Sequence, residues 1–231
     1  LNRNKEEQDL INCLAHFEEH KSNVLTPRGI YLYGSPGSGK SYFVGSILRK
    51  LNYDIIGYDA GDVRNKAIIE NITRHNMADV NILSLFKKEK KKIAILMDEI
   101  DGMNGGDKGG INSLIRLIRP KKTKKQKKEN TTMTPIICIG NYHMDKKIKE
   151  MMRVCHTIEL KRPTHPQIRN LGMILMPNLE KSVLESMVTF IQGDLRKLKA
   201  IYEIYKNQQS ILKNKIIVNM FHPKAFSEDT K

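Results

Sequence analysis

The segment GSPGSGKS, at residues 34 to 41, brings together the residue types that hold a phosphate group. Its three glycines let the backbone adopt conformations that side chains would forbid, so that successive N–H groups can point at an anion. Lys40 adds a positive charge for the β- and γ-phosphates of a nucleotide, and the Ser41 hydroxyl is placed to ligate Mg²⁺. The residues expected to bind the nucleotide are Gly34, Ser35, Pro36, Gly37, Ser38, Gly39, Lys40 and Ser41.

The spacing of this segment matches the pattern G-x-x-x-x-G-K-[ST]. A phosphate-binding loop of this kind needs a strand before it and a helix after it. The apolar run GIYLY predicts the strand, and SYFVGSILRKL predicts a helix whose positive N-terminal end would face the same phosphates. The alternative is a glycine-rich turn between a strand and a helix.

A second candidate feature is the acidic pair in IAILMDEID. The apolar strand would deliver Asp98 beside the phosphate-binding loop, where it can hold Mg²⁺ through water, while Glu99 can polarise the attacking water. On its own, such a pair also occurs in the first turn of a helix, where the positive N-terminal end of the helix stabilises acidic side chains. Together with the loop upstream, the pair predicts one metal-binding acid and one catalytic base.

Two further polar residues can reach the same phosphates. Asn141 ends the run PIICIGN, where its amide can hold the γ-phosphate or position the lytic water; the alternative is a turn-forming asparagine after glycine. Arg196, in GDLRKL, lies on a predicted helix of a smaller C-terminal domain; the alternative is an ordinary solvated helix arginine.

The composition favours a polyanionic partner. The 231 residues include 40 Lys and Arg against 25 Asp and Glu, a net charge of +15, and this balance favours nucleic acid over membrane. Cys13, Cys138 and Cys155 lie far apart without a C-x-x-C pair, which is typical of a reducing compartment and indicates neither a disulfide framework nor a zinc site. No signal peptide or run of about 18 apolar residues is visible, so we expect a soluble, intracellular protein.

Five short apolar runs alternate with helical patterns. The expected strands are GIYLY, YDIIGYD, KIAILMDE, PIICIGN and HTIEL. This alternation predicts an α/β fold with a parallel, doubly wound five-stranded sheet flanked by helices, and ligands at the carboxyl ends of the strands. The prolines of KRPTHP end the pattern, so we expect a core over residues 1–160, a small helical domain over 161–207 and a linker over 208–231.

A lysine-rich run, PKKTKKQKKEN, lies between the predicted helix INSLIRLI and the predicted strand PIICIGN. Its low complexity predicts a mobile, solvated loop. If its six lysines met nucleic acid, each contact with a phosphate would release about one counterion. The alternatives are a solvated insertion and a basic nuclear-import signal.

Six segments, in this order, resemble the AAA+ clamp-loader ATPases and most closely the large subunit of replication factor C: GSPGSGKS, DAGDVRNKAIIENI, LMDEIDGMNGGDKGGINSLIRLI, PIICIGN, LKRP and GDLRKL. The resemblance covers roughly residues 30 to 200. It implies an AAA+ core with a helical lid, ATP and Mg²⁺ as cofactors, and ATP-driven opening and loading of a sliding clamp at primer–template DNA. It also implies small clamp-loader subunits as partners, in the nucleus or at a viral replication site.

The resemblance assigns roles to matching positions. They are the Walker A residues Lys40 and Ser41, the Walker B pair Asp98 and Glu99, the first sensor Asn141 and the second sensor Arg196. The implied DNA contacts, at the starts of two predicted helices, are Arg64, Lys66, Gly110, Ile111 and Asn112. Contacts of this kind hold phosphates without reading sequence. For Arg64 and Lys66 the alternative is a solvated first helical turn.

The chain departs from the family pattern in three places. Small clamp-loader subunits carry Ser-Arg-Cys ahead of the last core strand, and that arginine reaches into a neighbour's ATP site. Here Val154 stands at the arginine's position, with Arg153 one place away; the large subunit also lacks this arginine, so the departure supports a large-subunit identity. The adenine-holding stretch is not recognisable near the N-terminus, and residues 208–231 are too few for the family's helical collar.

Two other functions stay open. One is another DNA-remodelling AAA+ motor, such as a helicase loader or a branch-migration ATPase. The other is a nucleotide-switched scaffold with little hydrolysis of its own. A clamp loader should be stimulated by clamp and recessed-end DNA together, whereas another DNA-remodelling motor should not. A clamp loader should also hydrolyse ATP in the presence of its partners, whereas a nucleotide-switched scaffold should hydrolyse little.

Overall fold

The computed structural model describes residues 1–59, 91–101, 108–129, 131–142 and 145–207. By its internal contacts the described chain divides into two compact units. The described residues of 2–34 and 40–160 form what we call the core unit, and residues 1, 35–39 and 161–207 form the helical unit. Each unit is described by itself.

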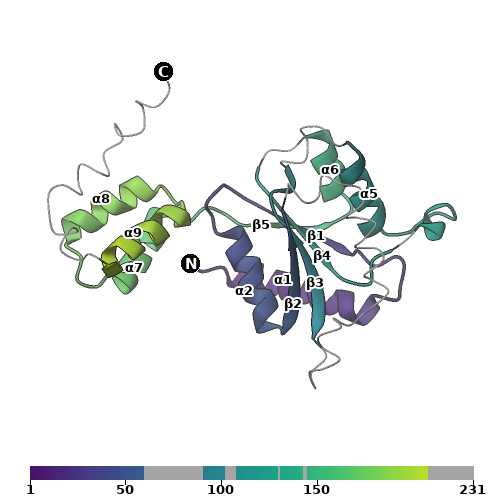
Figure 1. Ribbon diagram of the computed structural model, residues 1–231, viewed down its shortest axis with the longest axis horizontal. Helices are drawn as coiled ribbons and strands as arrows, with labels where there is room; N and C mark the ends of the chain where they lie inside the picture. Colours follow the sequence, from purple (N-terminus) through teal and green to yellow (C-terminus); the bar gives the residue numbers. More distant parts are fainter. Residues whose placement is uncertain (60–90, 102–107, 130, 143–144, 208–231) are drawn as a thin grey trace. The chain divides into compact units, whose positions relative to one another are not determined.

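A sheet of five parallel strands lies at the centre of the core unit, in the order β2-β3-β4-β1-β5 (Figure 1). The strands are β1 Gly29–Tyr33, β2 Tyr53–Tyr58, β3 Lys92–Met97, β4 Ile136–Gly140 and β5 His156–Glu159. The register pairs Tyr33 with Gly140 and Met97 with Cys138, so the residues that follow β1, β3 and β4 leave the sheet at one edge. The predicted α/β fold with a five-stranded parallel sheet is confirmed.

Helices cover both faces of this sheet (Figure 1). Successive side chains of a strand point to opposite faces, and accordingly Ile30 and Leu32 of β1 pack in one core cluster while Tyr31 packs in the other. The helices α1 Asn4–His20 and α2 Lys40–Lys50 contribute to the first cluster. The helices α5 Lys108–Ile118 and α6 Lys146–Met152 contribute to the second. The core unit is therefore a three-layer structure.

Helix α1 is an element that the sequence analysis did not predict. Leu10, Leu14 and Phe17 recur at helical spacing and are all buried against the sheet. Burial of such side chains stabilises a fold by about 1.5–3 kcal/mol each. The helix is also tied to β5, because His156 Nε2 lies 3.0 Å from Asp9 Oδ1.

Three helices make up the described part of the helical unit beyond residue 160: α7 His165–Leu175, α8 Lys181–Ile191 and α9 Leu195–Asn207. A capping box formed by Thr164 and Gln167 starts α7. The apolar faces of the three helices form a cluster of their own, centred on residues such as Ile168, Met187 and Ile191. No helix in the described part of the chain is long and apolar enough to cross a membrane.

The lysine-rich segment is anchored to the core unit, so the prediction of a mobile, solvated loop is wrong for its first lysine. Lys121 is 0% exposed, and its Nζ donates to the Arg116 carbonyl oxygen and to Glu129 Oε2, the latter at 3.1 Å. Charge counting missed this contact because a lysine can bury its stem while its ammonium group reaches a carboxylate. The other five lysines of the run are exposed, and the short 3₁₀ helix η2 Gln126–Lys128 lies among them.

Candidate nucleotide-binding site

Lys40 lies at the edge of the sheet where β1 and β4 end. It is the first residue of α2, and its Nζ donates to the Gly34 carbonyl oxygen at 2.9 Å and to Asn141 Oδ1 at 3.0 Å. Asn141 follows β4, and its Nδ2 donates to Asp101 Oδ2 at 2.9 Å. A chain of hydrogen bonds thus runs from the end of β1 through Lys40 and Asn141 to the segment after β3.

Ser41 and Asp98 form a second contact at this edge. The Ser41 hydroxyl donates to Asp98 Oδ2, and the Asp98 backbone N–H donates to the Tyr58 carbonyl oxygen at 2.8 Å. The latter bond holds the start of the segment after β3 against the end of β2. A hydroxyl and a carboxylate in contact are hard oxygen donors of the kind that Mg²⁺ prefers, so these two residues fit a magnesium ion.

Glu99 has an unusual backbone conformation. Its φ of 52° lies in the left-handed region, which non-glycine residues seldom adopt, and its N–H donates to Asp98 Oδ1 at 2.9 Å. Its side chain is exposed. Backbone strain of this kind gathers at functional sites, so the conformation supports a functional hypothesis for Glu99.

The loop before Lys40 has the backbone that its glycines allow. Gly37 and Gly39 have φ values of 74° and 84°, where a side chain would be strained. Within the helical unit, the Leu195 N–H donates to the Gly37 carbonyl oxygen at 2.8 Å, and the Asp194 carboxylate lies where a Cβ on Gly37 would be. Any other residue at position 37 would therefore be disfavoured, both by the backbone conformation and by the Asp194 carboxylate.

Arg196 belongs to the helical unit and is paired with a carboxylate there. Its side chain is 71% exposed, and its Nη2 and Nε donate to Asp194 Oδ2 at 2.9 Å and Oδ1 at 3.2 Å. Burial would raise the pKa of Asp194, but the hydrogen bonds from Arg196 outweigh it and the pKa is lowered. Asp194 thus links Arg196 to the glycine loop within this unit, a contact that the sequence analysis missed.

Residues 30–162 match the family described as "ATPase family associated with various cellular activities (AAA)". The chain belongs to the AAA family. This match covers more than half of the chain and every core residue placed above in the candidate site.

Curated relatives of this AAA chain are named as subunits of replication factor C. The chain is 29% identical over 209 residues to replication factor C subunit 1 of Saccharomyces cerevisiae, which covers 82% of this chain and 23% of the relative. It is 30% identical over 148 residues to the human subunit 1, covering 62% of this chain and 12% of the relative. It is 28% identical over 199 residues to the large subunit of Nanoarchaeum equitans, covering 84% and 41%. The chain therefore spans less than half the length of these relatives, and its resemblance to the large subunit of replication factor C is confirmed.

The predicted DNA contacts of this AAA chain lie partly outside the described residues, because Arg64 and Lys66 fall there. The other three lie in the first half of α5, which begins at Lys108. Gly110 is buried, and Ile111 is 3% exposed within the core, so its side chain does not face solvent. Asn112 accepts a hydrogen bond from Lys147 Nζ at 2.7 Å.

Asp101 is a site residue that the sequence analysis did not single out, although it is the third acid of the run DEID. Besides its bond from Asn141, it has an oxygen, Oδ1, that is buried without a hydrogen-bond partner in the described part of the chain. Nearby, burial and then the charge of Asp101 raise the pKa of the Tyr31 phenol. Asp101 orients the Asn141 amide, because an amide whose NH₂ group is held must present its oxygen to Lys40.

Position 154, where the resemblance places the arginine of small clamp-loader subunits, is packed into the fold. Val154 is partly buried against the core cluster beneath α5 and α6. Arg153, at the C-terminal end of α6, is exposed. The AAA core therefore uses position 154 for packing.

Proposed function

We propose that this chain is the ATPase portion of a clamp-loader large subunit. In this proposal it binds ATP with Mg²⁺, hydrolyses it, and helps to open a sliding clamp and load it onto primer–template DNA. It works beside small clamp-loader subunits, in the nucleus or at a viral replication site. AAA membership and the names of the relatives support this function.

One observation supports the nucleotide site most directly. At the ends of three strands, Lys40 is hydrogen-bonded to Asn141 and Ser41 to Asp98. Lys40 Nζ would exchange its bonds to neutral oxygens for stronger, charge-assisted bonds to phosphate oxygens. Ser41 and Asp98 would hold Mg²⁺, which supplies positive charge opposite the phosphates when bound.

The remaining roles follow from the same placement. Glu99, next to the metal acid, would accept the proton of the attacking water. Asn141, oriented by Asp101, would hold that water or the γ-phosphate. Arg196, whose side chain is 71% exposed, would leave its pairing with Asp194 and place its guanidinium on the phosphates, where charge-assisted bonds to phosphate oxygens replace the ion pair.

The packing of Val154 predicts that this chain offers no arginine to a neighbour's nucleotide. An arginine supplied across an interface accelerates hydrolysis by about 10³-fold or more in related enzymes. We therefore expect the chain alone to bind ATP and turn it over slowly. Small subunits that carry the Ser-Arg-Cys arginine should raise the rate at its site.

The test is the ATPase rate of the chain alone and mixed with small subunits whose own Walker A lysines have been removed, with and without clamp and recessed-end DNA. We expect stimulation by the full mixture and none when this chain carries Lys40→Ala, which should also abolish ATP binding. Fast turnover by the chain alone, abolished by Arg153→Ala, would instead identify a self-sufficient homo-oligomeric motor.

A further inference from the structure

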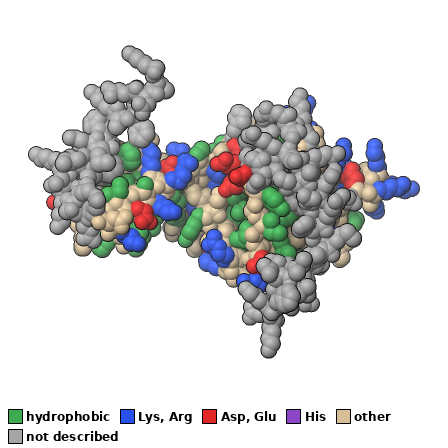
Figure 2. All heavy atoms as spheres, in the orientation of Figure 1, with side chains coloured by type: hydrophobic (Ala, Val, Ile, Leu, Met, Phe, Trp, Pro, Cys, Tyr) green, Lys and Arg blue, Asp and Glu red, His purple; other side chains and the backbone are tan. Residues whose placement is uncertain are grey.

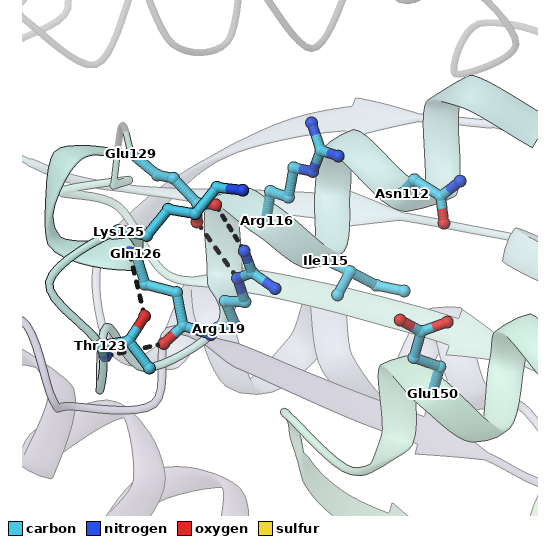
Figure 3. Close-up of a pocket in the computed structure, with 9 residues that line it drawn as sticks. All are labelled: Asn112, Ile115, Arg116, Arg119, Thr123, Lys125, Gln126, Glu129 and Glu150. Atoms are coloured by element: carbon cyan, nitrogen blue, oxygen red, sulfur yellow. Dashed lines mark hydrogen bonds and ion pairs between the residues drawn. The ribbon is translucent and has the colours of Figure 1, made fainter.

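A pocket of about 650 Å³ lies between α5, α6 and the lysine-rich segment (Figure 3). The segment leads into the first residue of β4, Ile136, whereas Asn141 follows the last residue of β4. The pocket therefore begins at the opposite end of β4 from the nucleotide site. None of its lining residues takes part in the contacts of Lys40, Ser41 or Asp98 described above.

Positive charge is concentrated around this pocket. Between residues 116 and 129 the chain carries two arginines and six lysines against one carboxylate, that of Glu129. The segment projects at the right-hand end of the core unit in Figure 1, and Figure 2 shows blue Lys and Arg side chains gathered on it. Cations held this close repel one another, and a polyanion would relieve that repulsion.

The carboxylates of the pocket already have partners. Glu129 accepts from Arg119 Nη2 at 2.5 Å (Figure 3). It also accepts from Lys121 Nζ at 3.1 Å. Glu150 accepts from Lys147 Nζ at 3.1 Å. The side chains of Arg116 and Lys125 also line the pocket, and in the described part of the chain they make no hydrogen bond or ion pair.

The lysine-rich segment holds Lys125 on a fixed turn. Gln126 Oε1 accepts from the N–H groups of Lys122 and Thr123 at 3.0 Å each, and the Gln126 N–H donates to Thr123 Oγ1 at 3.2 Å. Buried Lys121 anchors the start of the turn. A turn that is ordered before binding loses little conformational entropy when a ligand arrives.

We propose that this pocket binds a backbone phosphate of DNA between Arg116 and Lys125. The planar guanidinium can hold two phosphate oxygens at once, and the ammonium adds a point charge. DNA fits better than a single phosphate, because the four exposed lysines Lys122, Lys124, Lys127 and Lys128 extend the positive surface beyond the pocket. Binding of this kind is independent of sequence. The inference rests on the proposed function only in taking DNA as the polyanion. It is separate from the predicted contacts at Arg64 and Lys66, whereas Asn112, another predicted contact, lines this pocket.

The test is fluorescence anisotropy of a labelled blunt 20-base-pair duplex with the full chain, without nucleotide, at several salt concentrations. Arg116→Gln with Lys125→Gln removes the contacts with one phosphate, so it should reduce the slope of log affinity against log salt by about one and weaken binding about 10-fold at 0.1 M salt. The matched control is Lys5→Gln with Arg49→Gln, which removes the same charge from exposed positions on α1 and α2. The control should keep the native slope.

Equal losses in the pocket variant and the control would overturn the proposal, because net charge alone would then explain binding. Polyglutamate is the probe for an acidic protein partner: if the pocket variant loses polyglutamate binding but keeps DNA binding, the pocket is not a DNA site. The assay needs neither ATP nor clamp. A failure of the clamp-loading function would therefore appear in the ATPase mixture and leave this result unchanged, and Arg64→Gln with Lys66→Gln reports the other predicted DNA contact separately.

Discussion

Gly140 is the last residue of β4, directly before Asn141, and its missing side chain leaves room for a tyrosine on the neighbouring strand. A Cβ placed on Gly140 would overlap the hydroxyl oxygen of Tyr31 and lie 2.9 Å from Tyr31 Cζ. Real Cβ atoms essentially never approach that closely. Gly140→Ala therefore forces two central strands of the sheet to adjust.

The cost follows from how little either residue can move. Tyr31 is 0% exposed, Gly140 is buried, and β1 and β4 are paired along their length. Overpacking of a core by one methyl group costs about 1–3 kcal/mol, and a rigid ring between paired strands places this site in the upper half of that range. A chain of this size loses about 2–4 °C of unfolding temperature per kcal/mol, so we expect a fall of about 5–10 °C.

Tyr31→Phe provides the matched test, because it removes the oxygen that the new methyl group would meet. The Tyr31 hydroxyl is buried and has no hydrogen-bond partner in the described part of the chain, so its removal alone should be neutral or slightly stabilising. In the double variant the cost of Gly140→Ala should fall to about half, since the contact with Cζ remains.

The free energy of unfolding of the four proteins is measured by guanidinium denaturation followed by circular dichroism. We expect a coupling free energy of about 1 kcal/mol or more between the two positions. Additive effects, or a Gly140→Ala variant as stable as the native chain, would show that the hydroxyl does not occupy the space beside Gly140.

Three other predictions concern single side chains. Glu99→Gln should bind ATP with native affinity and stop hydrolysis, because the amide keeps the shape and loses the base; normal turnover in a steady-state assay would remove Glu99 from that role. Lys121→Ala should lower the free energy of unfolding by about 1–3 kcal/mol, because it leaves the Arg116 carbonyl and Glu129 without their buried partner; exposed Lys122→Ala should stay within about 0.5 kcal/mol, and equal effects would contradict the anchoring contact. Burial and then Asp9 raise the pKa of Cys13 to about 11, so the thiol stays protonated through neutral pH and its alkylation by iodoacetamide should rise about tenfold per pH unit from pH 7 to 10; a plateau near pH 9, measured by mass spectrometry, would contradict that environment.

The sheet and most of the residues at its nucleotide-binding edge could be predicted from the sequence, because each of these signals lies within a short segment. The five apolar runs became the five strands, and the parallel order then brought the ends of β1, β3 and β4 together. Lys40, Asp98 and Asn141 each follow or adjoin one of these ends, so their meeting required only a correct topology. Their chemical roles remain predictions.

The features that were missed depend on contacts between distant segments. The sequence does not distinguish Asp101 from the acids beside it, because its contact with the Asn141 amide joins segments that are 40 residues apart. The role of Lys121 is invisible in a run of lysines, because only burial against Glu129 separates it from Lys122. Helix α1 had a readable signal in Leu10, Leu14 and Phe17, and it was missed because polar and charged residues outnumber the apolar ones in this segment.

The two candidate sites stand at opposite ends of one strand, which raises the question of whether they are coupled. β4 is hydrogen-bonded to β3 on one side and β1 on the other, and its residues are all buried. Coupling between sites needs an element with two arrangements, and a central strand held on both sides is poorly suited to that role. We therefore expect the loss of DNA affinity caused by Arg116→Gln with Lys125→Gln to be the same, within about threefold, with and without a non-hydrolysable ATP analogue. The measurement repeats the anisotropy titrations at saturating analogue in the Glu99→Gln background. A loss that appears only with the analogue would show that β4, or the segments around it, does change between two arrangements when the nucleotide site fills.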